Sequence, residues 1–311
     1  MRERPKFFGR LPQTTLVAPE LRRWKPGQAC VTVPLLGLIG GVRMLARGLA
    51  ILCVSCLAAP AAAADPQAPT GKWVLNYEAA QCNAYRNYGT EKDPLYLAFK
   101  APPVGDVVQL MVVQDGPRMS AEQHDINVRI GDRPPLKTNM LVYRQKAKFR
   151  TKLINLPRAE FEALRDAPSV EIKGEGQDYA FALSDTASLM KALDTCLADL
   201  RDHYNVSAPG VPIPRLQRGA VGNLIRLFSA QDYPGVAVTR RMEGTTGLEL
   251  LIDENGSVAD CSVTATSGYA IIDAQSCAVI MKRAKFAPAI DLQGKPTRST
   301  YSQRISWVMK P

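Results

Sequence analysis

A stretch of eight residues, Ser207 to Pro214, constrains the fold more than any other part of the sequence. Half of its residues are proline or glycine, and its apolar residues do not recur at helical spacing. Proline lacks the backbone N–H donor and glycine weakens regular structure, so such a stretch continues neither a helix nor a strand. We therefore predict a linker at 207–222, between an N-terminal domain at 71–206 and a C-terminal domain at 223–311.

An apolar segment near the start of the chain has the organisation of an export signal. Met44 to Arg47 forms a short basic start, residues 48–60 are mostly apolar, and alanines precede Asp65. This order is typical of a secretory signal peptide. We predict that residues 1–64 are a precursor segment, with Met44 as a candidate true start, and that the mature protein is periplasmic. A retained segment would instead anchor the protein in the inner membrane, although its apolar run is shorter than the ~20 residues of a spanning helix.

The formal net charge of +10 is concentrated in this precursor segment. Residues 1–64 hold nine basic and two acidic side chains, whereas the rest of the chain has a net charge of only +3. Proteins that bind nucleic acids neutralise phosphates with an excess of lysine and arginine. The sequence therefore gives no reason to expect a nucleic-acid partner, and membrane association is expected only if the N-terminal segment is retained.

Of the seven cysteines, four follow Ala64: Cys82, Cys196, Cys261 and Cys277. An even number is typical of exported proteins, which form disulfides in an oxidising compartment. Four cysteines allow three connectivities, and the sequence alone does not choose among them. Their spacing suggests one disulfide in each domain, Cys82 with Cys196 and Cys261 with Cys277.

Zinc is the competing explanation of the four cysteines. None of them lies in a C-x-x-C pair, and the chain has only two histidines, His124 and His203. We therefore predict neither a metal site nor a cofactor. Because the sequence also lacks a nucleophile elbow and a phosphate-binding glycine loop, we predict no catalytic residues and do not expect an enzyme.

The N-terminal domain has the sequence pattern of a β-rich fold. Short β-type runs occur at 73–77, 96–99, 107–113 and 126–130. Residues 187–200 have the period of an amphipathic helix, with Asp185 or Thr186 as its N-cap. We predict a mostly antiparallel sheet closed by this helix, whose apolar face presents Cys196 to the sheet.

The C-terminal domain is predicted to combine a hairpin, one helix and a final strand. Alternating runs at 248–252 and 257–264 flank a turn that ends at Gly256, where glycine supplies the positive φ of the turn. Asp273 is a candidate N-cap for a helix through Lys282. The run from Tyr301 to Val308 alternates again and predicts a strand. The two domains together predict an α+β fold.

Eight short signals follow one another along this domain. They are Tyr233-Pro234, Gly247, Asp253 to Gly256, Ser267-Gly268, Ile272-Asp273, Phe286 to Ala289, Gly294 to Pro296 and Tyr301 to Val308. In this order they resemble the C-terminal domain family of the TonB energy transducers. The resemblance covers residues 223–311 and does not extend to the N-terminal domain.

The resemblance implies a small domain with one helix packed on a three-stranded antiparallel sheet. In TonB this domain pairs with an extended peptide of an outer-membrane receptor and passes on energy from the inner membrane. An exposed sheet edge offers unpaired N–H and C=O groups, and an added peptide strand completes the ladder. The resemblance thus implies a protein or peptide partner in the outer membrane or periplasm, and a link to TonB-dependent transmembrane transport.

If strand addition applies here, the final strand is the docking edge and Tyr233-Pro234 lies beside it. The candidate binding residues are Tyr233, Pro234, Tyr301, Gln303, Arg304 and Ser306. A structural interpretation stays open, in which Tyr301, Ile305 and Trp307 fill the packed face of the sheet and Tyr233-Pro234 fixes the entry of the chain. Arg304 is expected to point outward.

Two departures from a full transducer affect the functional hypothesis. TonB has a membrane anchor followed by a long proline-rich spacer, whereas here the apolar segment is predicted to be cleaved and a folded domain takes the place of the spacer. These departures weaken the expectation of force transmission but not that of peptide or protein binding in the envelope. The alternative is a periplasmic structural or adaptor protein that does not take part in transport, whose N-terminal domain performs the recognition.

Overall fold

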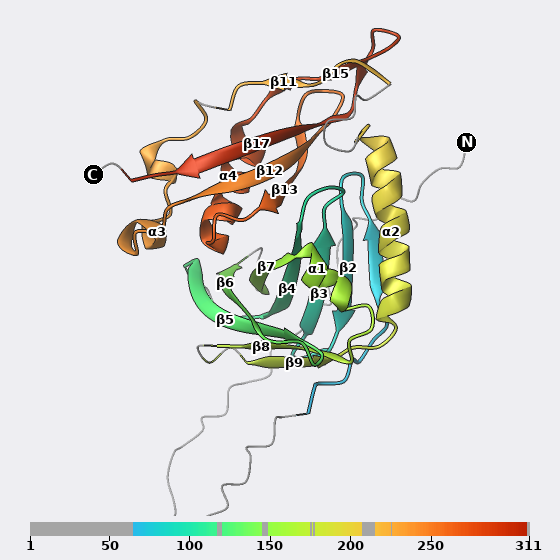
Figure 1. The fold of residues 1–311 in the computed structure, drawn as a ribbon, viewed down its shortest axis with the longest axis vertical. Helices are drawn as coiled ribbons and strands as arrows, with labels where there is room; N and C mark the ends of the chain where they lie inside the picture. The colour runs from blue at the N-terminus through green and yellow to red at the C-terminus, as the bar shows by residue number, and fades with distance from the viewer. Residues whose placement is uncertain are drawn as a thin grey trace, which may run out of the picture. The chain divides into compact units, whose positions relative to one another are not determined.

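A computed structural model of the protein describes residues 65–116, 120–144, 149–174, 176, 178–206, 215–224 and 226–309 (Figure 1). All of these residues fall in one compact unit. The predicted precursor segment, 1–64, and the proline-rich part of the predicted linker, 207–214, lie outside the described residues.

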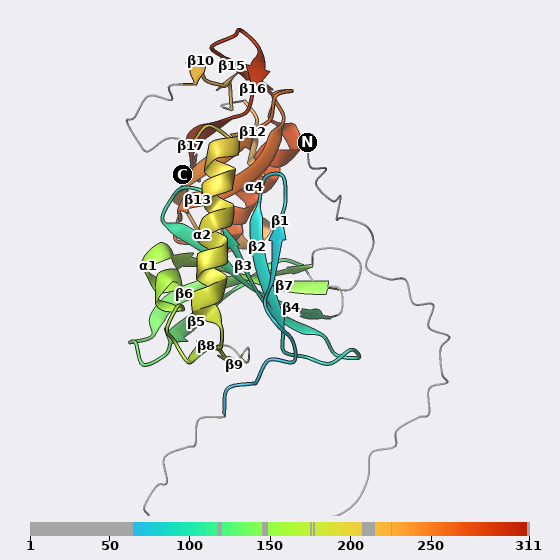
Figure 2. The ribbon, with the colours of Figure 1, turned by 90° about the vertical axis from the view of Figure 1, so that its right-hand side faces the viewer.

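An antiparallel sheet of nine strands, called here the first sheet, forms the N-terminal part of the fold (Figure 1 and Figure 2). The strand order is β1-β2-β3-β4-β7-β6-β5-β8-β9, and every neighbouring pair is antiparallel. The strands are β1 (Val74–Tyr77), β2 (Cys82–Asn87), β3 (Leu95–Ala101), β4 (Val107–Asp115), β5 (Glu122–Ile130), β6 (Leu136–Arg144), β7 (Phe149–Pro157), β8 (Ser169–Lys173) and β9 (Tyr179–Ala182). The predicted α+β class and the mostly antiparallel pairing are confirmed.

Strand β5 illustrates how the sequence builds this sheet. Ile126, Val128 and Ile130 are buried, and the polar residues that alternate with them are exposed. Successive side chains of a strand point to opposite faces, so the apolar set covers one face of the sheet. The central strands β4 and β7 add Leu110 and Ile154 to the same hydrophobic core.

Helix α2 (Thr186–His203) closes this core and runs beside β1 and β2 (Figure 1), while the short helix α1 (Arg158–Ala163) follows β7. The predicted apolar face of α2 is buried, including Leu189, Leu193 and Cys196. Cys196 forms a disulfide with Cys82 at the start of β2. The first of the two suggested disulfides is therefore present.

The predicted N-cap of α2 is only partly correct. Asp185 occupies the N-cap position, but its side chain makes no capping hydrogen bond. Its φ of 59° places the backbone in the left-handed region, and its carboxylate lies 3.8 Å from the guanidinium of Arg86. The hydroxyl of Thr186 donates to the carbonyl oxygen of Arg165. Contacts to distant segments therefore hold this helix start, in place of a local cap.

The C-terminal part of the fold contains a second sheet with the strand order β13-β12-β17, antiparallel throughout. Strands β12 (Gly244–Ile252) and β13 (Val258–Ala265) form the predicted hairpin, and β17 (Ser299–Trp307) is the predicted final strand. Helix α4 (Ala270–Arg283) packs on β12 and β13, and the Cys261–Cys277 disulfide joins it to β13. This is the helix on a three-stranded sheet that the resemblance implied.

The tip of the hairpin requires glycine at position 256. Gly256 has a φ of 75°, and a Cβ atom added there would clash with the carbonyl oxygen of Phe286. The backbone N–H of Phe286 donates to the carbonyl oxygen of Gly256 at 2.9 Å, which keeps the two segments this close. Any other residue at this turn would need both a strained backbone and a shift of the neighbouring segment.

The predicted start of α4 at Asp273 is wrong. The helix begins at Ala270, and Asp273 lies fully buried in its first turn. The backbone N–H of Ala270 donates to Oδ1 of Asn139 at 2.7 Å, and that of Ile271 donates to Oε1 of Gln123 at 3.1 Å. These acceptors come from β6 and β5 of the first sheet, so no local cap is needed.

Short elements surround the second sheet. They are β10 (Leu216–Arg218), β11 (Val221–Gly222), the 3-10 helix η1 (Ala230–Asp232), α3 (Gly235–Thr239), β14 (Phe286–Ala287), β15 (Ala289–Asp291) and β16 (Pro296–Thr297). Strand β10 pairs with β15, which also pairs with β16, and β11 pairs with β14. The end of the predicted linker, from 216 to 222, is therefore structured and pairs with the C-terminal domain.

We expect the two disulfides to contribute unequally to the free energy of unfolding. They join residues that are 114 and 16 positions apart. In the chain-entropy model a disulfide stabilises by restricting the unfolded chain, by about 4–5 kcal/mol for the longer span and about 3 kcal/mol for the shorter. Denaturant unfolding of C82A/C196A and of C261A/C277A, followed by circular dichroism, measures both losses. A larger loss from C261A/C277A would contradict this expectation.

Candidate functional site

Strand β17 is an edge of the second sheet. Among the described strands it pairs only with β12, along all nine residues from Ser299 to Trp307. Its other side therefore carries backbone N–H and C=O groups that no described strand takes up. A strand of this length offers a ladder to which an extended peptide can add.

The opposite edge of this sheet, β13, is covered by residues of the N-terminal domain. Asp260 on β13 is 3% exposed, and it accepts hydrogen bonds from Nζ of Lys100 and Nε2 of Gln81, both at 2.6 Å. Val107 of β4 belongs to the same hydrophobic cluster as Val263 of β13. Of the two edges of the sheet, β13 is therefore the one that these contacts cover.

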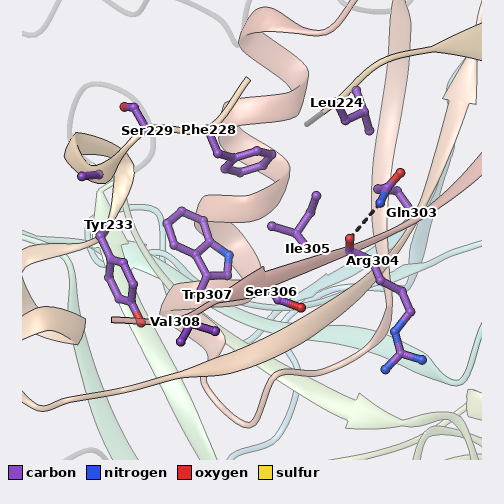
Figure 3. Close-up of a pocket in the computed structure, with 11 residues that line it drawn as sticks. Leu224, Phe228, Ser229, Tyr233, Gln303, Arg304, Ile305, Ser306, Trp307 and Val308 are labelled. Atoms are coloured by element: carbon purple, nitrogen blue, oxygen red, sulfur yellow. Dashed lines mark hydrogen bonds between the residues drawn. The ribbon is translucent and has the colours of Figure 1, made fainter. Parts of the chain in front are cut away.

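A cavity of about 390 Å³ opens beside this edge (Figure 3). Residues 303–308, at the end of β17, form one wall, and Leu224, Phe228, Ser229, Ala230 and Tyr233 form the other. The three aromatic rings converge in Figure 3, with the Trp307 ring centroid 5.5 Å from that of Phe228 and 5.1 Å from that of Tyr233. Both pairs meet edge to face, which is a favourable geometry for aromatic rings.

Hydrogen bonds fix two of these aromatic side chains. The indole Nε1–H of Trp307, a residue only 5% exposed, donates to Oγ of Ser276 at 2.8 Å. The phenol of Tyr233 donates to the carbonyl oxygen of Met242 at 2.6 Å. Burial raises the pKa of the Tyr233 phenol, so it remains a donor at neutral pH. The aromatic wall of the cavity is therefore held in place without a ligand.

Side chains along β17 alternate in exposure. Ser302, Arg304 and Ser306 are exposed, whereas Gln303 and Ile305 between them are half-buried. Figure 3 shows the guanidinium of Arg304 extending away from the aromatic rings. No acidic side chain among the described residues forms an ion pair with Arg304 that the structure records. The hydroxyl of Ser302 donates to the carboxylate of Glu249, and that of Ser306 is hydrogen-bonded to the hydroxyl of Thr245, both on β12. The exposed face of β17 therefore presents one cation, Arg304, toward solvent.

Four of the six predicted binding residues, Tyr233, Gln303, Arg304 and Ser306, line the cavity. Two do not. Pro234 precedes helix α3 as its N-cap residue. Tyr301 packs its ring against Phe286 at 4.9 Å and donates from its phenol to the carbonyl oxygen of Gly222.

The sequence-based prediction identified Tyr233 but missed the rest of the second wall of the cavity. Leu224 and Phe228 fall within the predicted C-terminal domain but were not considered as binding residues, and Trp307 had been considered only as a residue of the packed face. The apolar residues between the predicted linker and Tyr233-Pro234 were the available signal, because a solvated loop has no reason to carry them.

A salt bridge holds the wall formed by residues 227–233. The guanidinium of Arg283 on α4 donates to both carboxylate oxygens of Asp232, at 2.6 and 2.7 Å, and to the carbonyl oxygen of Leu227 at 2.7 Å. The N–H and hydroxyl of Ser229 also donate to Asp232, each at 2.8 Å. The hydrogen bonds from Arg283, and then those from Ser229, hold the pKa of Asp232 well below its usual range.

The C-terminal part of the fold is a small domain with one helix packed on a three-stranded antiparallel sheet that ends at the edge strand β17. Residues 229–309 match the family model described as Gram-negative bacterial TonB protein C-terminal. This match confirms the resemblance of the C-terminal domain to the TonB C-terminal family. No curated protein and no solved structure matches the chain significantly. The first sheet lies outside the matched residues.

The TonB C-terminal domain indicates a TonB-like protein of the cell envelope, because members of this family interact with outer-membrane proteins. Among the helices that the structure describes, none has the length and apolar character needed to cross a bilayer.

We expect the Asp232–Arg283 salt bridge to make stability depend on pH in the acid range. Because the pKa of Asp232 is lower in the folded than in the unfolded state, its contribution to stability is complete above about pH 5 and is lost as the pH falls toward the folded value. The thermal midpoint of the wild type should fall between about pH 5 and pH 2, and that of D232N should fall less steeply. The exposed control D132N should keep the wild-type slope. Equal slopes for D232N and the wild type would exclude this role.

Proposed function

We propose that this protein binds an extended segment of an outer-membrane or periplasmic partner by strand addition to β17. The observation that carries the proposal is the uncovered edge of β17 beside the aromatic cavity. A peptide strand laid along β17 would gain main-chain hydrogen bonds over up to nine residues. Affinity would then come mainly from the backbone, and sequence preference from the side chain that enters the cavity.

The cavity and its rim indicate the chemistry of the preferred peptide. The aromatic rings of Phe228, Tyr233 and Trp307 favour an apolar side chain, and a volume of about 390 Å³ accommodates a branched aliphatic or an aromatic one. Arg304 lies at the rim and favours an acidic residue nearby. The proposed ligand is therefore an extended peptide that places an apolar side chain in the cavity and carries at least one carboxylate.

The family match supports a place for this binding in TonB-related transport across the envelope. In this proposal the protein acts in the periplasm after export, and the precursor segment determines whether it is released or anchored. The first sheet stands where a transducer has its extended spacer, which supports a binding role more directly than force transmission across the periplasm.

The experiment is titration of the protein with a blocked octapeptide of alternating threonine and valine that contains one glutamate. Isothermal titration calorimetry should detect saturable binding. The same peptide with N-methylated alternate amides should not bind, because it cannot complete the ladder. Equal binding of the N-methylated peptide would contradict strand addition.

We expect R304E to weaken binding of the octapeptide roughly two- to tenfold. The exposed attraction between Arg304 and the glutamate of the peptide becomes a repulsion of similar size. The matched control is R218E, which makes the same charge change at an exposed arginine on β10. Since electrostatic effects at an exposed site are screened, the difference between the two variants should shrink at high salt. Equal losses in R304E and R218E would show that the protein's net charge, and not the edge of β17, determines binding.

The adaptor alternative predicts a different result in the same titration. If the N-terminal domain performs the recognition, the octapeptide should bind equally to the wild type and R304E, or to neither. A partner captured through the first sheet would then be insensitive to changes at β17.

A further inference from the structure

Helix α4 connects the first sheet to the cavity beside β17 through two buried contacts. Oδ2 of Asp273, in the first turn of α4, accepts a hydrogen bond from Nδ2 of Asn155 on β7 at 3.0 Å. Ser276, three residues later on the same helix, accepts the indole N–H of Trp307. Residues three positions apart share one side of a helix, so α4 places both contacts on the same buried surface.

The group around Asp273 is closed to water. Asp273, Thr246 and Ser276 are each 0% exposed. Besides the Asn155 amide, the carboxylate of Asp273 accepts from the hydroxyl of Thr246 at 2.8 Å, the hydroxyl of Thr266 at 2.5 Å and the N–H of Ser267 at 2.8 Å. A buried carboxylate with fixed donors has little freedom to move, because losing a donor leaves an unsatisfied oxygen.

A second set of contacts ties α4 to the first sheet independently of Asp273. Asn139 of β6 and Gln123 of β5 accept from the first N–H groups of α4, and Nδ2 of Asn139 also donates to the carbonyl oxygen of Gly268 at 2.6 Å. Leu141 of β6 lies in one hydrophobic cluster with Trp307. The strands β5, β6 and β7 therefore set the position of the helix that holds Trp307.

We propose that the first sheet contributes to peptide binding at the edge of β17, with Asn155 as a positioning residue. Through Asp273 and α4, Asn155 fixes the place of Trp307 at the cavity, so the affinity of β17 for an extended peptide depends on a residue of the N-terminal domain. This inference rests on the proposed function. It concerns the contact between Asn155, which lies outside the segment that matches the TonB family, and Asp273, which lies inside it.

The test uses the full chain with the variant N155L, which keeps the size of the side chain and removes its donor. The first measurement is the ¹H–¹⁵N resonance of the Trp307 indole, assigned with W307F. The second is the affinity for the threonine–valine octapeptide. We expect the indole resonance to shift and the affinity to fall roughly two- to thirtyfold, the range found for mutations along coupled networks.

Two controls separate positioning from a general loss of stability. N127A changes an exposed asparagine on β5 and should alter neither measurement. V170A truncates a core residue of the first sheet, on β8, and should lower the thermal midpoint without moving the indole resonance. A shift of the same size in V170A would overturn the proposal.

An exchange of the Asn155 and Asp273 side chains gives a result that a merely structural role of Asn155 would not produce. N155D places two carboxylates together and should weaken binding more than N155L, whereas N155D/D273N re-forms an amide–carboxylate pair with the roles reversed and should recover part of the affinity. Wild-type affinity and an unchanged indole resonance in N155L would overturn the inference while leaving strand addition intact. If the wild type fails to bind the octapeptide, the proposed function is lost, and the indole resonance still decides whether Asn155 positions Trp307.

Discussion

Two buried carboxylates of the C-terminal domain, Asp260 and Asp273, hold the second sheet against residues of the N-terminal domain. These contacts determine which edge of the second sheet stays accessible, namely β17. Asp260 is neutralised by Lys100, and Asp273 is surrounded by four hydrogen-bond donors, one of which is Asn155. A buried carboxylate without such partners is strongly unfavourable, so these contacts permit few alternative arrangements. Apolar packing alone would tolerate small displacements of the second sheet, whereas these directional contacts do not.

This arrangement leaves one edge of the second sheet covered and the other open. An open edge is a hazard, because any exposed strand can pair with it. Strand β17 carries Arg304 and two serines on its exposed side, and a charged side chain on an edge discourages pairing with unselected strands. In the proposed function the same cation would also select a peptide that offers a carboxylate. Protection of the edge and recognition of the peptide would then use the same residue.

Several elements could be predicted from the sequence because their signals are local. The Asp253–Gly256 turn, the alternation along β17 and the four cysteines each act over a few residues or through a covalent constraint, and the structure contains the hairpin, the strand and both disulfides. The start of α4 could not be predicted, because its cap is Asn139, which is 131 positions away from Ala270.

The candidate site could be predicted only in part for the same reason. Alternation identified β17 and the resemblance pointed to Tyr233, whereas the part of the wall formed by Leu224 and Phe228 depends on the salt bridge between Asp232 and Arg283 across 51 positions. The proposed role of Asn155 could not be predicted either, because the sequence shows only a single asparagine among the apolar residues at the end of β7. Asn155 donates to the carboxylate of Asp273, which lies 118 positions further along the chain.

Backbone amide hydrogen exchange, with and without the threonine–valine octapeptide, tests strand addition at β17 most directly. An amide that gains a hydrogen bond to an added strand exchanges more slowly. We predict that the peptide slows exchange within residues 299–307 and leaves the N-terminal strands β1 and β9 unchanged. Slower exchange in β1 or β9, with none in β17, would place recognition in the first sheet and contradict the account.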